Sequence, residues 1–395
     1  MQLTRVQEKG LKIAIDRYNQ GYKYTVISGY AGTGKSTLVR FIIDALNITE
    51  DKICYCAFTG KAAEVLRKKG NKNVRTLHKL LYESIPKPSG GFIRKPKLSI
   101  VYKVVVVDEI SMAPKTLIDL LFTHDVYVIC LGDPGQLPPI EKDEDNHLLD
   151  CPHIFLDEIM RQAQESEIIR LTMAIRENKP INYFKGNEVQ IIPKKELTTG
   201  ILKWGDQILV ATNLTKNNIN TKMRKLFEKE GAPTDGDKII CLRNYWDDLS
   251  QNESPLINGT IGIVKNSFLT KRYLPYFIAK QFKKTYFNVF IGDLVIPEIQ
   301  DFYSSVEMDY DMIITKNKCC DWKLSYALGR LKQKYGEIVP KEFDFAYAIT
   351  IWKAQGSEWN NVVVLEENFP YDKETHIRAM YTAATRASQK LVWVR

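Results

Sequence analysis

The chain has 395 residues, of which 44% are hydrophobic and 26% charged, with a formal net charge of +9. This length suits two or more domains with separate cores, and no apolar run approaches a membrane span, so no membrane partner is expected. The first residues lack a signal-peptide core, and seven cysteines are scattered without a disulfide framework or zinc spacing. These features favour reduced thiols in a reducing cytoplasm, and the positive charge favours a polyanionic partner.

Residues 29–36 read Gly-Tyr-Ala-Gly-Thr-Gly-Lys-Ser and complete the phosphate-binding pattern G-x-x-x-x-G-K-[ST]. They lie between an apolar run at 24–28 and a helical pattern at 37–46. In that context the glycines let backbone N–H groups and the helix N-terminus point at a polyphosphate. Lys35 then reaches the β/γ-phosphates, and the Ser36 hydroxyl can ligate Mg²⁺. The segment therefore predicts a nucleoside triphosphate site.

Strand and helix patterns alternate from residue 1 to about 157, and the strand-like runs are almost continuously apolar. These runs are Thr25–Ser28, Ile53–Ala57, Val104–Val107 and Val126–Leu131. Such runs are typical of a parallel sheet covered on both faces. The alternation is interrupted at 83–97, where prolines and glycines exclude a helix and Gly90-Gly91 can turn a short hairpin with Phe92 near its tip.

The α/β pattern returns with a helix at 165–178, a strand at 207–211 and a helix near 216–227. Between about 238 and 340 the chain instead shows short strands with turn-rich, aromatic and charged connections, at 238–242, 259–264 and 286–290. We expect the aromatic residues of this module, such as Trp246, Tyr273 and Tyr276, to be packed locally or in its core. A further strand at 345–350 and one at 362–365 close the α/β pattern, so the β-rich module is predicted to be an insertion.

Acidic and amide side chains follow two of the predicted strands. Asp108, directly after the strand 104–107, can hold Mg²⁺ through water, and Glu109 can orient or deprotonate an attacking water. Gln136 lies on a Gly/Pro loop after the next strand, where its amide could sense a γ-phosphate or water. The pair Asp108-Glu109 is a weak signal alone, but in the same α/β unit as a complete phosphate loop it predicts hydrolysis of the triphosphate.

In their order along the chain these motifs resemble the superfamily 1 helicases of the RecD/Dda branch, and the resemblance covers nearly the whole chain. It implies an α/β fold of two RecA-like parallel-sheet domains, with a pin hairpin inserted in the first and an SH3-like β-rich domain in the second. The implied ranges are 1–81 with 101–157, 82–100 (pin), 158–237 with 341–395, and 238–340 (β-rich). The Asn258-Gly259-Thr260 turn resembles one in the family's inserted domain.

The resemblance also implies roles for residues. Gln7 is similar to the family's adenine-contacting glutamine, and Arg161 and Arg386 match arginines that reach the nucleotide from the second domain. The predicted nucleotide-binding residues are Gln7, Gly29, Gly32, Thr33, Gly34, Lys35, Ser36, Thr37, Gly356 and Glu358, with Mg²⁺ held by Ser36 and Asp108. The predicted catalytic residues are Lys35, Asp108, Glu109, Gln136, Arg161 and Arg386. The predicted DNA-binding residues are Thr59, Gly60, Lys61, His78, Phe92, Thr350, Trp352 and Lys353.

Two positions depart from the family pattern. Trp352 stands where the family usually has histidine, and Phe58 where it usually has proline. Trp352 could keep a DNA contact by stacking on a base, whereas coupling through an imidazole is left open.

The resemblance implies an ATP- and Mg²⁺-dependent DNA helicase that moves 5′-to-3′ on single-stranded DNA and acts on duplex or fork DNA. The resemblance leaves open whether the protein also has protein partners, such as single-strand-binding, replication or recombination proteins. It implies the cytoplasm of a bacterial or phage-infected cell. A single-strand translocase or RNA helicase with weak unwinding would keep every ATPase residue and is the nearest alternative. A nucleoside kinase or GTPase fits poorly because the chain shows no convincing N-K-x-D motif, and a degenerate ATPase is opposed by the complete set of motifs.

Overall fold

The computed structural model describes residues 3–86, 92–138, 146–160, 164–251, 255–297, 301–331, 338–367 and 372–395. The chain forms two compact units. The first comprises Met1–Glu83, Pro96–Lys216 and Ile349–Arg395, and the second Ser84–Lys95 and Asn217–Ala348. Within the described residues, no helix has both the length and the apolar composition needed to cross a bilayer.

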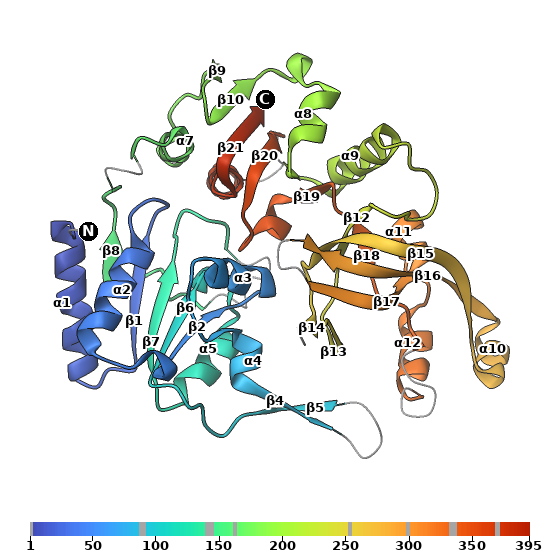
Figure 1. Ribbon diagram of the computed structural model, residues 1–395, viewed down its shortest axis with the longest axis horizontal. Coiled ribbons are helices and arrows are strands. Elements are labelled where there is room, and N and C mark those ends of the chain that lie inside the picture. Colours follow the sequence, from blue (N-terminus) through green and yellow to red (C-terminus); the bar gives the residue numbers. More distant parts are fainter. Residues whose placement is uncertain are drawn as a thin grey trace. The chain divides into compact units, whose positions relative to one another are not determined.

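The first unit contains a six-stranded sheet in the order β3-β2-β6-β7-β1-β8, and every pairing in it is parallel (Figure 1). Its strands are β1 (Tyr24–Gly29), β2 (Ile53–Ala57), β3 (Val74–Thr76), β6 (Val104–Asp108), β7 (Tyr127–Gly132) and β8 (Ile154–Leu156). The predicted parallel sheet is therefore confirmed.

Helices cover both faces of this sheet because its strands are apolar on both sides. Val105 and Val107 of β6 pack in one core, and Val104 and Val106 pack in the other, as the two-residue period of a strand requires. The first core takes leucines from α4 (Leu77–Leu81) and α5 (Lys115–Phe122), and the second takes residues from α1 (Arg5–Asn19) and α2 (Lys35–Leu46). Helix α3 (Gly60–Lys68) and the short turns η1 (Glu50–Lys52) and η2 (Ile110–Met112) complete this part.

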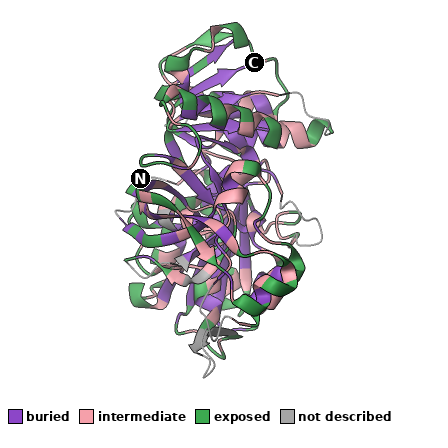
Figure 2. Ribbon diagram, turned by 90° about the vertical axis from the view of Figure 1, so that its right-hand side faces the viewer, coloured by how far each residue is buried: buried purple, intermediate pink, exposed green. Residues whose placement is uncertain are grey.

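A second six-stranded sheet has the order β19-β11-β20-β21-β10-β9. Strands β11, β20, β21 and β10 pair in parallel, and β9 is antiparallel to β10. The strands are β9 (Phe184–Lys185), β10 (Val189–Ile192), β11 (Gln207–Val210), β19 (Ala348–Thr350), β20 (Trp359–Leu365) and β21 (Ala387–Val394). The helical elements around them are α7 (Glu167–Arg176), η4 (Lys194–Glu196), α8 (Thr199–Trp204), α9 (Asn213–Leu226), η6 (Ile351–Ala354) and α14 (Lys373–Ala384). Figure 2 shows the strands largely buried and the outward faces of the helices exposed.

The second unit is built on an antiparallel sheet in the order β17-β16-β15-β12-β18. Its strands are β12 (Lys238–Cys241), β15 (Ile261–Tyr273), β16 (Tyr286–Ile296), β17 (Asp301–Asp309) and β18 (Phe343–Phe345). The pair β13 (Tyr245–Leu249) and β14 (Pro255–Leu256) and the helices α10 (Tyr276–Phe282), α11 (Tyr310–Thr315) and α12 (Trp322–Gly329) surround it. The predicted β-rich character is borne out, whereas the SH3-like assignment stays a prediction.

Two sequence expectations about these strands were wrong in detail. The run 345–350 is not one strand: the chain leaves the antiparallel sheet at Phe345 and joins the second parallel sheet at Ala348. Strand β15 does not stop near Val264 but continues to Tyr273, with a register shift between Lys265 and Phe268 that interrupts its regular pattern.

The expectation of local packing for the aromatic residues of this unit was also partly wrong. Tyr273 is 65% exposed and Tyr276 80% exposed, although the Tyr273 ring does contact that of Tyr286 at 5.8 Å. The side chain of Trp246 lies outside the described residues.

A two-stranded hairpin joins β4 (Tyr82–Pro86) and β5 (Phe92–Pro96) at the predicted place. Residues 87–91, including Gly90-Gly91, lie outside the described residues. Phe92 is the first residue of β5, and its side chain is likewise not described.

Candidate active site

The phosphate loop joins β1 to α2. Gly34 has a φ of +79° and caps the N-terminus of α2, and a Cβ at this position would lie 2.4 Å from Nε2 of Gln7. Only glycine therefore fits both the backbone conformation and the space. The Lys35 ammonium donates to the carbonyl oxygens of Gly29 at 2.5 Å and Tyr30 at 3.0 Å. The loop thus holds a cation and a helix N-terminus together, which is an arrangement that binds phosphate.

An acidic pair lies at the end of β6. Asp108 is the last residue of the strand, and Glu109 follows with a φ of +51°, a strained conformation for a residue with a side chain. The Glu109 N–H donates to Asp108 Oδ1 at 2.9 Å, which helps to hold this turn. Burial, and next the charge of Glu109, raise the pKa of the Asp108 carboxyl. Two close carboxylates beside the Ser36 hydroxyl fit a hard divalent cation such as Mg²⁺.

Gln136 connects this acidic pair to an arginine of the second sheet. Turning its amide by 180° lets the nitrogen donate to Glu109 Oε2 at 3.2 Å and the oxygen accept from Arg386 Nη2 at 3.2 Å. The predicted catalytic residues Glu109 and Gln136 are therefore in contact, and Arg386 adjoins both.

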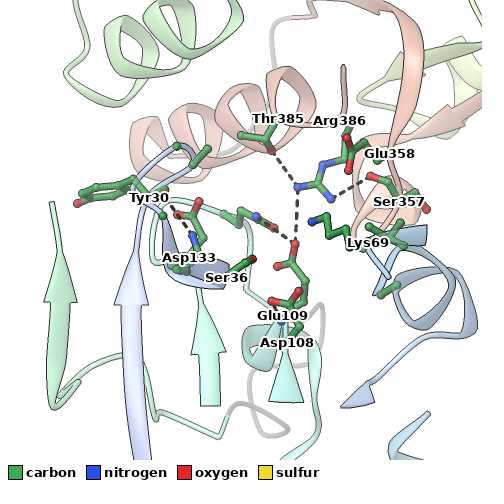
Figure 3. Close-up of a pocket in the computed structure, with 18 of the residues that line it drawn as sticks. Tyr30, Ser36, Lys69, Asp108, Glu109, Asp133, Ser357, Glu358, Thr385 and Arg386 are labelled. Atoms are coloured by element: carbon green, nitrogen blue, oxygen red, sulfur yellow. Dashed lines mark hydrogen bonds and ion pairs between the residues drawn. The ribbon is translucent and has the colours of Figure 1, made fainter. Parts of the chain in front are cut away.

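Arg386 itself is 4% exposed and is held by its own neighbours. Its guanidinium donates to the Thr382 carbonyl at 3.1 Å, to the Ser357 carbonyl at 3.2 Å and to the Thr385 hydroxyl at 2.9 Å. Its Nη2 lies 3.9 Å from Glu109 Oε1 (Figure 3). A buried arginine fixed in this way presents positive charge at a set position in the cavity.

The cavity between these groups encloses about 270 Å³. Its lining comes from the phosphate loop, the end of α3, the end of β6, the loop after β7, the turn 356–358 and the residues after α14. Of the predicted site residues it is lined by Gly32, Gly34, Lys35, Ser36, Thr37, Asp108, Glu109, Gln136, Gly356, Glu358 and Arg386. Predicted motifs more than 300 residues apart in sequence thus meet around one space.

Sequence reasoning missed several residues at this site, and two of them, Tyr381 and Lys69, make informative contacts. Tyr381 of α14 donates to Asp133 Oδ2 at 2.7 Å and accepts from the Ala31 N–H at 2.9 Å, and burial raises its pKa. Lys69, which follows α3, also lines the cavity and points toward the acidic pair (Figure 3). Tyr381 lies on the helix that leads to Arg386, which is a signal that could have found it, whereas Lys69 has no such signal.

Further hydrogen bonds join the loop after β7 to elements of the second sheet. The Leu137 N–H donates to the Thr382 hydroxyl at 3.0 Å, and Gln355 Nε2 donates to the Leu137 carbonyl at 2.7 Å. Buried bonds of this kind are sensitive to small displacements because an unsatisfied buried group is costly. Movement of either sheet therefore changes the surroundings of Gln136 next to this loop.

The remaining nucleotide residues lie close to the loop. Gln7 is 1% exposed, and its amide is engaged by the Thr4 N–H at 3.1 Å and the Thr33 carbonyl at 3.2 Å, so its contact with adenine stays a prediction. Gly29 is the last residue of β1, and its carbonyl oxygen accepts from the Lys35 ammonium at 2.5 Å. Arg161 lies outside the described residues, although the N–H of the preceding Met160 donates to the Gly32 carbonyl at 3.0 Å.

The predicted DNA contacts of the first sheet lie around α3 and α4. Thr59 caps α3 by accepting from the Ala62 N–H at 3.1 Å, and Gly60 is the first residue of that helix. The Lys61 ammonium is buried and lies 4.0 Å from the ring centroid of Trp359, in the second sheet. The His78 ring lies between those of Phe58 and Tyr82, at 5.8 and 6.2 Å.

The other predicted DNA contacts lie on η6 and on the hairpin. Thr350 precedes η6, and Trp352 and Lys353 are half-buried on it. Nearby Gly356 lies against the first sheet, since a Cβ there would be 3.1 Å from Thr59 Oγ1. The side chain of Phe92 is not described.

Two family models match the chain: an AAA domain at residues 7–191 and a UvrD-like helicase C-terminal domain at residues 345–394. The ATP-dependent RecD2 DNA helicase of Deinococcus radiodurans is 25% identical over 383 residues, which is 94% of this chain and 46% of that relative. The ATP-dependent DNA helicase Dda of phage T4 is 30% identical over 149 residues, 36% of this chain and 34% of the relative. The matched region therefore covers less than half of the full length of each of these two relatives.

The fold of the chain is also similar to that of a solved helicase structure. The crystal structure of a Bacteroides Pif1 helicase in complex with ADP-AlF3 and ssDNA has a TM-score of 0.50 and 19% identity, and the match covers 100% of this chain and 92% of that one. At this identity the likeness concerns the fold alone.

Proposed function

Because this chain belongs to the superfamily 1 helicases of the RecD/Dda-like branch, a family of ATP-hydrolysing DNA helicases, we propose that it hydrolyses ATP to move along single-stranded DNA and to separate duplex DNA. The observation that carries this proposal is the cavity that gathers Lys35, the acidic pair, Gln136 and Arg386. Phosphate-binding, water-orienting and charge-stabilising groups are all required for hydrolysis of a triphosphate, and they meet there.

Each group has a distinct role in the proposed hydrolysis. Lys35 binds the β/γ-phosphates, and Ser36 and Asp108 hold Mg²⁺, which supplies neutralisation of phosphate charge. Glu109 orients and deprotonates the attacking water. Arg386, together with Arg161, stabilises the charge that develops on the transferred phosphoryl group.

Coupling to movement follows from the bonds between the two parallel sheets. We assign residues 1–81 with 101–157 and 158–237 with 341–395 to two RecA-like domains that close on ATP and reopen after hydrolysis. Gln136 contacts Arg386 of the other domain, and the next residue, Leu137, accepts a hydrogen bond from Gln355. The phosphate state therefore reaches the proposed DNA-binding segment η6, which Gln355 directly follows. A different grip on the strand in the closed and open states makes the cycle directional.

The proposed strand path combines phosphate contacts with stacking, as binding without sequence preference requires. Four residues contact the backbone of the DNA strand: Thr59, Gly60, Thr350 and Lys353. Lys61 becomes available for the same role when the two domains open and its ammonium leaves the Trp359 ring. His78 and Trp352 offer rings to the bases. The 5′-to-3′ direction is carried over from the family resemblance.

Separation of the duplex is assigned to the hairpin 82–100 as a pin, with Phe92 at the junction, and the β-rich module 238–340 is assigned as an SH3-like domain. Fork DNA is then the natural substrate. We place the protein in the cytoplasm of a bacterial or phage-infected cell, in replication, repair or recombination; the free cysteines suit that reducing setting.

Strand separation on a forked duplex tests this proposal. The full chain should release a labelled strand with ATP and Mg²⁺ from a fork with a 5′ tail, and Lys35→Ala should not. Phe92→Ala should impair release while DNA-stimulated ATP hydrolysis stays nearly intact. ATP-driven movement without strand release by the unaltered chain would instead favour a translocase, and equal loss of both activities in Phe92→Ala would contradict the pin assignment.

A further inference from the structure

One end of the second unit carries a group of exposed aromatic rings, which we call the aromatic arm. Its members are Tyr273 (65% exposed), Tyr276 (80%), Phe277 (49%), Trp322 (74%) and Tyr326 (66%). They lie at the end of β15, on α10 and on α12, and the two helices pack against each other beside the end of the β15–β16 hairpin (Figure 1). Single exposed rings are ordinary, but five on three neighbouring elements indicate a binding surface.

The core of this region does not need these rings. Ile278 of α10 and Leu324 and Leu328 of α12 are buried and form a small core with β16. Trp322 and Tyr326 are four residues apart, so they share one face of α12, and that face is turned away from Leu324 and Leu328. The exposed rings are therefore surplus to folding.

The charge around the arm is mainly positive, although Asp321 directly precedes Trp322. Between Lys265 and Gly292 there are six lysines and arginines and no aspartate or glutamate. Arg272 is paired with Glu307, and the Lys271 ammonium lies 4.2 Å from the Tyr286 ring centroid. Lys280 and Lys283 are exposed, and the structure pairs neither of them with a carboxylate among the described residues.

We propose that the aromatic arm is a second binding surface for single-stranded DNA, separate from the strand path of the parallel-sheet domains. Bases would stack on Tyr276 and Trp322, and Lys280 and Lys283 would contact phosphates. Flat rings between cations suit a strand whose every base has a π face and whose backbone is negative. The inference rests on the proposed function for the identity of the strand, and it adds a longer footprint to that function.

Binding to oligothymidylates of increasing length, from about 8 nucleotides upward, tests the arm on the full chain without nucleotide. Tyr276→Ala/Trp322→Ala should weaken binding of long strands about tenfold and leave the shortest unchanged, since a strand that just fills the proposed strand path has no nucleotides left for the arm. The matched control is Tyr183→Ala/Trp204→Ala, which removes exposed rings of the first unit (63% and 38% exposed) and should leave all lengths unchanged.

Two further readouts keep the test independent of folding and of affinity alone. Long oligothymidylate should quench tryptophan fluorescence more than the shortest one does in the unaltered chain, and Trp322→Tyr should remove this additional quenching while the part due to Trp352 stays. Lys280→Glu/Lys283→Glu should reduce the slope of log Kd against log salt by about 1.4, the value for two lost single-strand phosphate contacts.

Equal length dependence in the arm variant and the unaltered chain, together with quenching that does not depend on Trp322, would overturn the proposal. Selective loss of binding to an acidic peptide such as polyglutamate, with DNA binding intact, would also overturn it and assign the arm to a protein partner. Hydrolysis stimulated by a short oligonucleotide should be the same in the arm variant. If the unaltered chain shows no stimulation, the proposed function fails, while the Trp322 signal still reports on the arm.

Discussion

The cavity of the first unit and the aromatic arm of the second are built in opposite ways. In the cavity, polar side chains are buried and bonded to one another, so each has one position, as Arg386 with its three hydrogen-bond partners illustrates. In the arm, rings such as Trp322 are mostly exposed, so neighbouring side chains do not fix their positions. Chemistry on a phosphate needs fixed groups, whereas binding a strand of any sequence needs accessible and adaptable ones.

Substitution of the buried cavity arginine should give the largest effect. Arg386→Ala removes the guanidinium that faces Glu109, and we expect kcat for ATP hydrolysis to fall by ~10³–10⁵. Arg378→Ala is the matched control, because Arg378 lies on α14, the helix that precedes Arg386, and pairs with Glu374 at the surface. A similar kcat for both variants would remove Arg386 from the proposed mechanism.

The second unit also buries an arginine, but there the role is structural. Arg224 pairs with Asp237 at 3.2 Å and donates to the carbonyls of Gly231 and Ala232, both at 2.7 Å. Arg224→Met removes the guanidinium that bonds to the buried Asp237, and Lys229 Nζ at 3.8 Å is too distant to replace those hydrogen bonds. The free energy of unfolding should therefore fall by ~3–5 kcal/mol in urea titration. The pair Arg272–Glu307 is more exposed, and Arg272→Met should cost ~0–1 kcal/mol. Equal losses would contradict this distinction.

Tyr381 tests whether the two parallel sheets are joined through the cavity. Tyr381→Phe removes the hydroxyl that bonds to Asp133 and to the Ala31 N–H. Both groups are left without this partner, so we expect a loss of about 1–3 kcal/mol in the free energy of unfolding, with slower hydrolysis. Tyr22→Phe serves as control, since Tyr22 is 50% exposed. Unchanged stability and turnover would mean that the Tyr381 hydroxyl does not link the sheets.

The smallest effect concerns a half-buried glutamate at the start of α7. Glu167 accepts from the N–H groups of Val189, Glu188 and Asn187, and these hydrogen bonds lower its pKa. A lowered pKa in the folded state means that the carboxylate stabilises the fold above its unfolded pKa, and that this contribution is lost as the pH falls through the folded value.

Glu167→Gln should therefore lower Tm slightly at neutral pH, and the difference should shrink as the solution is acidified below the ordinary glutamate pKa. Calorimetry over a pH series measures this, with exposed Glu8→Gln as control. A Tm difference that stays constant with pH would show that the charge of Glu167 is not responsible.

The sequence predicted those parts of the site whose signal is continuous along the chain. The phosphate loop, its flanking strand and helix, and Asp108-Glu109 after an apolar run are local patterns, and the structure has them at those positions. The resemblance supplied Arg386 from the far end of the chain, since no local pattern distinguishes one arginine from another.

Other features depend on contacts that no local pattern encodes. Tyr381 and Asp133 are 248 residues apart, so their bond was not predictable from spacing. The run 345–350 reads as one strand because its apolar character is continuous, yet its two ends pair in different sheets. The exposure of Tyr276 was missed because aromatic residues are usually buried, and only the packing of Ile278 shows which face of α10 is inward.

Steady-state ATP hydrolysis by the full chain, with and without single-stranded DNA at low and high salt, tests whether the nucleotide cavity is coupled to the bound strand. We predict strong stimulation of hydrolysis by DNA that weakens as salt rises and is absent in Lys35→Ala. Hydrolysis that depends on Lys35 but is indifferent to DNA at both salt concentrations would contradict the proposed coupling between the nucleotide cavity and the strand. Trp352 would then be the first residue to replace with histidine, the residue that the family usually has at this position.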